Sequence, residues 1–357
     1  LNHLNQPQKD ALIQAINGAT SRDQVAEKLK EAEALDEAMK QLEDQVNQDD
    51  QISNSSPFIN EDSDKQKIYN DKIQAAKDII NQTSNPTLDK QKIADTLQNI
   101  KDAVNNLHGD QKLQKAQQDA TNELNYLTNL NNSQRQSEHD EINSAPSRTE
   151  VSNDLNHAKA LNEAMRQLEN EVALENSVKK LSDFINADEA AQNEYSNALQ
   201  KAKDIINGVP TSTLDKATIE DALLELQNAR ESLHGEQKLQ EAKNQAVAEI
   251  DNLQALNPGQ VLAEKTLVNQ ASTKPEVQEA LQKAKELNTA MKLMRESIAD
   301  QDDIRHSSNY TNEDPAQQHT YEEAVNNVNA IISENTATMD PQTINQTTQA
   351  VANAKRG

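Results

Sequence analysis

The stretch Ala34-Leu-Asp-Glu-Ala-Met-Lys-Gln-Leu-Glu43 reappears as Ala160-Leu-Asn-Glu-Ala-Met-Arg-Gln-Leu-Glu169, at an offset of 126 positions (160 − 34). A looser third copy, Leu287-Asn-Thr-Ala-Met291, lies 126 positions further on. Leu107-His-Gly109 and Leu233-His-Gly235 keep this offset, and near the C-terminus it falls to 125. A fixed period of this length is typical of proteins built from repeated structural units. The 357 residues therefore hold about 2.8 copies of a 126-residue repeat.

Apolar residues within one repeat are spaced by three and four positions, which is the pattern of amphipathic helices. The pattern predicts one long helix over Val25–Val46 and further helices over 68–80, 88–107 and 113–127, with a short fifth over 12–16. No window alternates between apolar and polar residues, so we expect no β-sheet.

Helix starts are encoded at equivalent positions of each repeat. Ser21-Arg-Asp-Gln24, Ser147-Arg-Thr-Glu150 and Thr273-Lys-Pro-Glu276 predict capping boxes. Two further sets of residues are expected to be N-caps: Asp62, Asp188 and Asp314, and Thr87, Thr213 and Thr338.

Five helices per repeat form two three-helix bundles only if one helix serves both, and Val25–Val46 is the natural candidate. Its first half then closes one bundle and its second half opens the next. Between Leu107 and Leu113 the apolar stripe rotates by about 120°. The helix either breaks at Gly109 or continues with its core on another side, and both alternatives link neighbouring bundles end to end.

The composition excludes several classes of protein. Gly (6) and Pro (9) are too few for many hairpins or phosphate-binding loops. The 59 acidic and 35 basic residues give a net charge of −24, which argues against nucleic acid as a partner. There is no cysteine and no run long enough to span a membrane, so we expect no thiol chemistry and no membrane contact in this segment. The chain begins at Leu1 without a signal peptide, so we expect a fragment of a larger protein.

The order of these motifs resembles two known bacterial modules. The segment Leu113–Met165 is similar to a GA module, the three-helix unit named after albumin-binding surface proteins. The segment from Ala160, through Phe184-Ile-Asn186, to Leu233-His-Gly235 is similar to a FIVAR module. Alternating FIVAR and GA units of this period resemble the Ebh family (extracellular matrix-binding protein homologues), giant cell-wall-associated adhesins of Gram-positive bacteria. The resemblance covers the whole chain.

This resemblance implies an extracellular location on the bacterial cell surface or cell wall, with signal and anchor outside this segment. It also implies fibronectin or another host matrix protein as a partner, with peptidoglycan as an alternative contact. Albumin-binding GA modules carry aromatic and apolar residues around their second helix. The matching stretch Ser133–Ile142 has no aromatic residue, which argues against albumin as a partner.

We therefore predict an all-α fold of tandem three-helix bundles, joined end to end through shared long helices into an elongated, monomeric rod. The expected GA-like modules are residues 1–34, 110–160 and 236–286, and the expected FIVAR-like modules are residues 35–109, 161–235 and 287–357. We expect the first module to be truncated at its N-terminus and the last at its C-terminus.

Six of the seven aromatic residues occupy two positions of the repeat: Phe58, Phe184 and Tyr310, then Tyr69, Tyr195 and Tyr321. The tyrosines at the second position are the candidates for a ligand-binding patch that recurs once per repeat. The interpretation that we favour is that each ring pins a loop or a helix start onto its bundle, because these bundles contain little else that is large.

No residues form a catalytic, cofactor or metal motif. Of the seven histidines only His108 and His234 are repeat equivalents, and we interpret them as helix-end residues. Acidic clusters such as Glu61–Asp64 and Asp300–Asp303 lack the glycine of an EF-hand loop, so we interpret them as caps and solvated loops. With no Gly-rich loop and no nucleophile beside a base, we predict that the chain is not an enzyme.

Three functions remain open from the sequence. The first is a multivalent adhesin that binds matrix weakly through each module and gains affinity by repetition. The second is a passive stalk or wall-spanning scaffold with no host ligand in this segment. The third is an intracellular coiled-coil scaffold, which requires uninterrupted heptads and is opposed by helix caps every ~20–35 residues.

Overall fold

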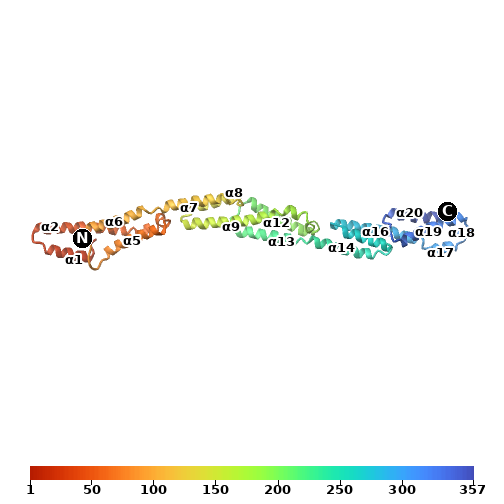
Figure 1. Ribbon diagram of the computed structural model, residues 1–357, viewed down its shortest axis with the longest axis horizontal. Helices are drawn as coiled ribbons and strands as arrows, with labels where there is room; N and C mark the ends of the chain where they lie inside the picture. The colour runs from red at the N-terminus through yellow and green to blue at the C-terminus, as the bar shows by residue number, and fades with distance from the viewer. The chain divides into compact units, whose positions relative to one another are not determined.

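The computed structural model describes all residues from 1 to 357 and contains only α-helices and connecting segments (Figure 1). It divides into two compact units, residues 1–166 with 206–216 and residues 167–205 with 217–357, which are described one at a time. The prediction of an all-α fold without strands is confirmed.

The GA-like modules are built from long helices. These are α1 (Gln6–Asn17) and α2 (Arg22–Val46), then α7 (Gly109–Leu124), α8 (Asn132–Ser144) and α9 (Arg148–Val172), then α14 (Gly235–Asp251), α15 (Pro258–Gln270) and α16 (Lys274–Ser297).

Each FIVAR-like module adds two very short helices, which the sequence pattern did not predict, and two long ones. The short helices are α3 (Asp49–Ser53) and α4 (Ser56–Ile59), α10 (Glu175–Val178) and α11 (Ser182–Ile185), and α17 (Gln301–Arg305) and α18 (Ser308–Thr311). The long helices are α5 (Ser63–Ile80) and α6 (Lys90–Asn105), α12 (Glu189–Asn207) and α13 (Lys216–Glu231), and α19 (Pro315–Ser333) and α20 (Pro341–Arg356).

The long helix α16 serves two bundles within the second unit. Its first half contributes Val277, Leu281 and Ala284 to a core shared with α14 and α15. Its second half contributes Leu287 and Met291, among others, to a separate core shared with α19 and α20. Helix α2 in the first unit likewise packs on α1 and on both α5 and α6. The prediction of a shared long helix is therefore confirmed.

One part of the predicted apolar stripe is exposed. Val25 and Leu29, on the first half of α2, are 39% and 46% exposed, whereas the equivalent Val277 and Leu281 are buried. In the third repeat α14 covers these positions, and within residues 1–357 no counterpart of α14 lies against α2. Burial of this half of the stripe thus depends on a third helix.

The chain breaks its helix at each Leu-His-Gly motif. Helix α6 ends at Asn105 and α7 begins at Gly109, and α13 ends at Glu231 and α14 begins at Gly235. His234 adopts a left-handed conformation with φ of 53°. The rotated apolar stripe left two alternatives open. The helix ends before the glycine and does not continue through it.

The predicted N-caps are partly wrong. Ser21 and Thr273 accept from the backbone N–H three residues on, as expected. The N-caps of α6 and α20 are Asp89 and Asp340, each two residues after the threonine that we expected. The threonine precedes the helix because its carbonyl is used elsewhere: the Thr87 oxygen accepts from another module, as described below.

The predicted capping boxes and aspartate caps also differ in detail. Gln24 does not return a bond to Ser21; its Oε1 accepts from the N–H of Thr20 instead. Asp62 and Asp314 stand at the N-cap positions of α5 and α19, but their side chains make no capping hydrogen bond.

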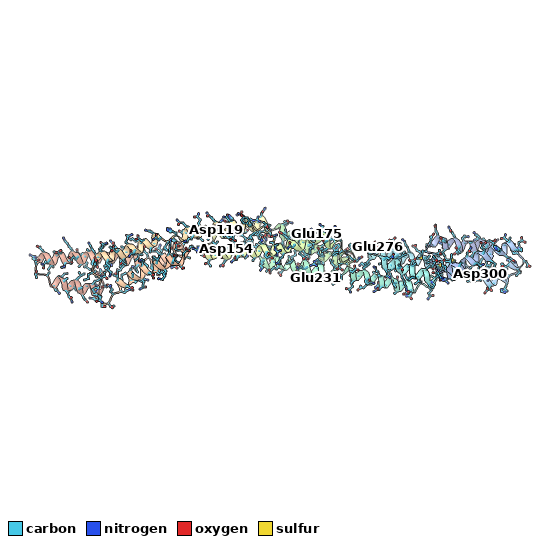
Figure 2. The ribbon with its side chains drawn as sticks, viewed as in Figure 1. Asp119, Asp154, Glu175, Glu231, Glu276 and Asp300 are labelled. Carbon is cyan, nitrogen blue, oxygen red and sulfur yellow. The ribbon has the colours of Figure 1, made fainter.

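Acidic side chains lie along both units (Figure 2). Four of the six carboxylates labelled there are exposed, and Asp154 and Glu175 are partly buried. The charge of −24 is therefore a property of the solvated faces of many helices rather than of one segment.

Shortening one buried side chain of the shared helix α16 tests this packing. Met291 is fully buried in α16, so Met291→Ala should lower the free energy of unfolding of the last module by about 2–5 kcal/mol, through lost burial and an unfilled cavity. Leu293→Ala, at a position 51% exposed on the same helix, should change it by only about 0.5 kcal/mol or less. Hydrogen exchange of α16, α19 and α20 in the full chain measures both, and equal effects would contradict the assignment of the core face.

Candidate functional site: the contacts between modules

The three candidate tyrosines lie in the cores of their FIVAR-like modules. Tyr69, Tyr195 and Tyr321 are 0%, 0% and 2% exposed. Each ring packs edge-to-face on the preceding aromatic residue, with centroid distances of 5.6, 5.9 and 5.8 Å. Such pairs stabilise beyond the area they bury. The rings are therefore placed to hold the short helices α4, α11 and α18 onto α5, α12 and α19.

The three tyrosine hydroxyl groups have different surroundings. The Tyr69 hydroxyl donates to Asp49 at 3.1 Å, and Asp49 also pairs with Lys77. The hydroxyl groups of Tyr195 and Tyr321 are buried without a hydrogen-bond partner. Burial raises the pKa of all three, so each stays neutral.

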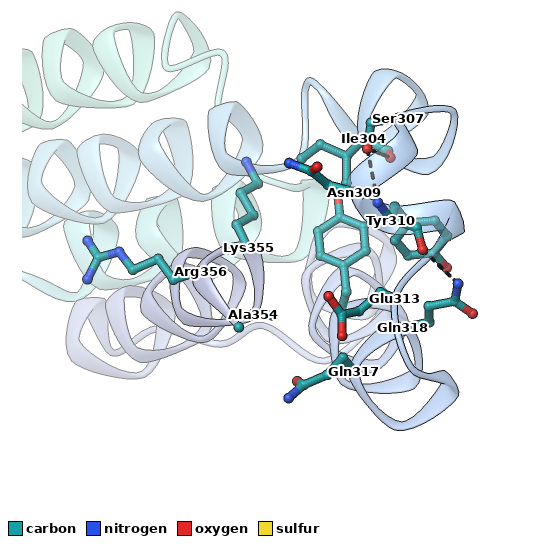
Figure 3. A pocket seen from close by; sticks show the side chains of 12 residues that line it. Ile304, Ser307, Asn309, Tyr310, Glu313, Gln317, Gln318, Ala354, Lys355 and Arg356 are labelled. Carbon is teal, nitrogen blue, oxygen red and sulfur yellow. Dashed lines mark hydrogen bonds between the residues drawn. The ribbon is translucent and has the colours of Figure 1, made fainter.

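A cavity of about 310 Å³ lies beside Tyr310 and Tyr321, between α18, α19 and the end of α20 (Figure 3). Its polar lining includes Asn309, Glu313 and Gln317. In the first two repeats α7 and α14 pack against the equivalent short helices α4 and α11. The cavity is therefore not a feature that recurs in each repeat, and it does not support a repeated ligand site.

The contact from a GA-like module to the following FIVAR-like module is a buried amide clasp. An asparagine N-cap and the glutamine three residues later form a reciprocal capping box in α1, α8 and α15. The glutamine side chain is fully buried and donates to a threonine carbonyl of the next module at 2.8–2.9 Å. The donor–acceptor pairs are Gln8 to Thr87, Gln134 to Thr213 and Gln260 to Thr338.

The asparagine of each clasp makes a second contact to the next module. Its Nδ2 donates to the carbonyl of an isoleucine near the end of a FIVAR-like helix, and the pairs are Asn5 to Ile79, Asn131 to Ile206 and Asn257 to Ile331. Because the same two side chains cap their own helix and satisfy carbonyls of the neighbour, loss of either leaves buried polar groups unpaired.

The contact from a FIVAR-like module to the following GA-like module uses a buried asparagine. Asn60 donates to the Pro146 carbonyl at 3.2 Å and accepts from the Arg148 N–H at 2.9 Å. In the second unit Asn186 makes the same pair of bonds to Ser272 and Lys274. Each asparagine thus ties the short helix of one module to the start of a long helix in the next.

The glycine of the Leu-His-Gly motif allows this contact to close. A Cβ atom at Gly109 would lie well under 3.0 Å from the carbonyl oxygens of Ser56 and Pro57. Gly235 has the same relation to Ser182 and Asp183. Since only a residue without Cβ permits this approach, these glycines are required by the backbone of the neighbouring module rather than by their own φ angle.

Ion pairs surround the same contact. Asp62 accepts from Lys112 at 2.8 Å and from Arg148 at 2.9 Å, and Asp188 lies between Lys238 and Lys274. The hydrogen bond from Lys112 holds the pKa of Asp62 below its ordinary value, and Lys238 does the same for Asp188. A carboxylate with a lowered pKa stabilises the fold above its ordinary pKa and loses that contribution as the pH falls. The groups are about half exposed, so each pair contributes little alone.

Sequence reasoning missed the clasp although its signal is readable. Asn5, Asn131 and Asn257 are each followed three residues later by glutamine, which is the spacing of a capping box. Their contacts with the next module lie 74–79 positions away in sequence, where no local pattern indicates a partner.

Two other findings concern site chemistry. No group of three or more His, Cys, Asp or Glu side chains is arranged to hold a metal ion. No helix combines the length and apolar character that crossing a bilayer requires.

Comparison with family models assigns both modules. A GA-module model matches residues 1–38, 110–164 and 236–290. A FIVAR-domain model matches residues 38–108, 164–234 and 290–357. The chain belongs to the family of GA-module and FIVAR-domain repeats. The resemblance inferred from the sequence is confirmed. Successive matches meet within the long helices α2, α9 and α16 or at the breaks next to Gly109 and Gly235.

Proteins similar to these GA and FIVAR repeats occur in staphylococci. The extracellular matrix-binding protein ebh of Staphylococcus aureus is 43% identical over 99% of this chain, which spans 3% of that protein. The extracellular matrix-binding protein EbhA of the same species is also 43% identical over 99% of this chain, which spans 5% of it. A crystallised EbhA domain from Staphylococcus aureus matches with a TM-score of 0.65 and 26% identity, covering 69% of this chain and 98% of that domain.

The glycine contact gives a direct test. Gly235→Ala should push α14 away from α11, since the added Cβ meets backbone rather than a flexible side chain, and should destabilise the contact by about 1–3 kcal/mol. Gly18→Ala is the matched control, because a Cβ there meets nothing closer than 3.4 Å. Hydrogen exchange at residues 182–187 and 235–240 should accelerate only in the first variant. Unchanged exchange in Gly235→Ala would show that the modules are not in contact there.

Proposed function

We propose that the chain is an adhesive and structural repeat segment of a bacterial cell-surface protein, located outside the cell and acting as a monomer. The observation that carries this proposal is 43% identity over 99% of the chain to proteins named as extracellular matrix-binding. We propose a host matrix protein such as fibronectin as the partner, and no enzymatic activity. Nucleic acid and albumin are not among the proposed partners.

Repetition supports a multivalent mode of binding. The chain presents GA and FIVAR modules in alternation, so one ligand surface would recur at a fixed period. We propose that each module binds weakly and that affinity grows with the number of modules engaged at once. We also propose module boundaries near residues 34, 109, 160, 235 and 286; those at 34, 160 and 286 fall inside α2, α9 and α16 because these helices continue from one module into the next.

Binding can be measured with immobilised fibronectin and two forms of the protein, the 357-residue chain and a head-to-tail duplicate. We expect weak binding by the single chain and at least about tenfold tighter apparent binding by the duplicate. Serum albumin serves as the control ligand and should give no signal. Absence of fibronectin binding by both forms at micromolar concentration would refute fibronectin as the partner of this segment.

A passive stalk that contacts peptidoglycan is the second candidate, favoured by the repeated polar clasps at successive module contacts. Such a stalk would be an extended rod in solution. Small-angle scattering should then give a radius of gyration well above the ~20 Å of a compact protein of this length. A compact value would remove the stalk, and sedimentation with purified peptidoglycan tests the contact itself.

A further inference from the structure

Two GA modules bury a carboxylate at the same position of the second helix. Glu138 on α8 and Glu264 on α15 are each 2% exposed. Their counterpart in the first module, 126 positions before Glu138, is Leu12. Helix α1 forms with Leu12 at this position, so the carboxylate is not needed to build the helix.

Glu264 lacks compensating hydrogen bonds. Its Oε2 is buried and has no hydrogen-bond partner. Lys283 on α16 acts on it only through its charge, since the amine lies 3.5 Å from Glu279 and is largely exposed. Burying a carboxylate without hydrogen bonds penalises its charged form.

Two other lysines on the helices of this module have partners of their own. On α14, which also packs on α15, Lys243 donates to the carbonyl of Asn269. On α15 itself, Lys265 pairs with Asp251. Neither forms an ion pair with Glu264.

At the equivalent position of the second GA module, the carboxylate of Glu138 has a partner. Its Oε1 lies 2.8 Å from Nδ1 of His157 on α9, at the place that Lys283 takes in the third module. Asp154 on α9 and Glu141 on α8 add negative charge around it, which opposes the effect of His157. Burial still dominates and raises the pKa of Glu138 above its ordinary value.

We propose that Glu264 makes the third GA module pH-responsive, so that α14, α15 and α16 open less often as the medium is acidified from neutral pH. Protonation of the carboxyl group removes a buried, uncompensated charge. The three helices of the module then open most often at neutral pH and less often in a mildly acidic medium.

The direction follows from linkage. Burial raises the pKa of Glu264 above its ordinary value, so the folded module binds the proton more readily than the unfolded chain. The free energy of unfolding therefore rises as the pH falls through the folded-state pKa, and levels off below the unfolded-state pKa. Carboxylates with lowered pKa, such as Asp188, act in the opposite direction at lower pH.

Hydrogen exchange of the full chain at pH about 7 and about 5, corrected for the intrinsic effect of pH on exchange, tests the proposal. In the unmodified chain the opening of α14–α16 should become at least threefold less frequent at the lower pH. Glu264→Gln keeps the shape but cannot titrate, so this change should vanish. Glu286→Gln, at an exposed position of α16 that does not pair with Lys283, should leave it intact.

Glu264→Leu provides a second variant, with the residue type that the first module carries at this position. It should also abolish the pH response, and at neutral pH it should open less often than the unmodified chain. An equal pH response in the unmodified chain and in both Glu264 variants would overturn the proposal.

Discussion

The scarcity of large apolar side chains is the constraint on which this structure depends. Only 34% of the residues are hydrophobic and 2% are aromatic, so no single three-helix bundle buries much apolar surface. Sharing one helix between two bundles offsets this scarcity, since α16 fills one core with its first half and another with its second. Stability is then distributed over neighbouring modules, as in other repeat proteins.

Polar contacts between modules follow from the same constraint. Narrow bundles bring helix ends together, and helix ends carry unpaired N–H and C=O groups. Gln260 and Asn257 illustrate the solution, because each satisfies its own helix terminus and a carbonyl of the next module. The amide clasps and the close approach at Gly235 therefore fix how one module meets the next. They do so without the large apolar interface that this composition lacks.

Much of the fold was readable from local pattern. The apolar spacing around Met39 and Met291 marked the shared helix, and the rotated stripe after Leu107 marked a change of core. The errors have physical causes. Thr87 was expected to cap a helix, but its carbonyl is bound by Gln8, and Asp89 supplies the cap instead. The short helices were not predicted because four or five residues are too few to show the repeated apolar spacing of a helix.

For the candidate site, too, the sequence located the residues and the packing decided their role. Periodicity located Tyr69, Tyr195 and Tyr321, but only packing shows that these rings lie inside the modules. By itself the sequence determined the all-α class, the 126-residue period, the shared helices and the acidic surface, because each follows from residue order and composition. The tertiary structure alone decided which groups meet between modules, why Gly109 and Gly235 must lack a Cβ, and that Glu264 is buried without a partner. Those contacts join residues far apart in the chain, and local sequence carries no information about the distance between them.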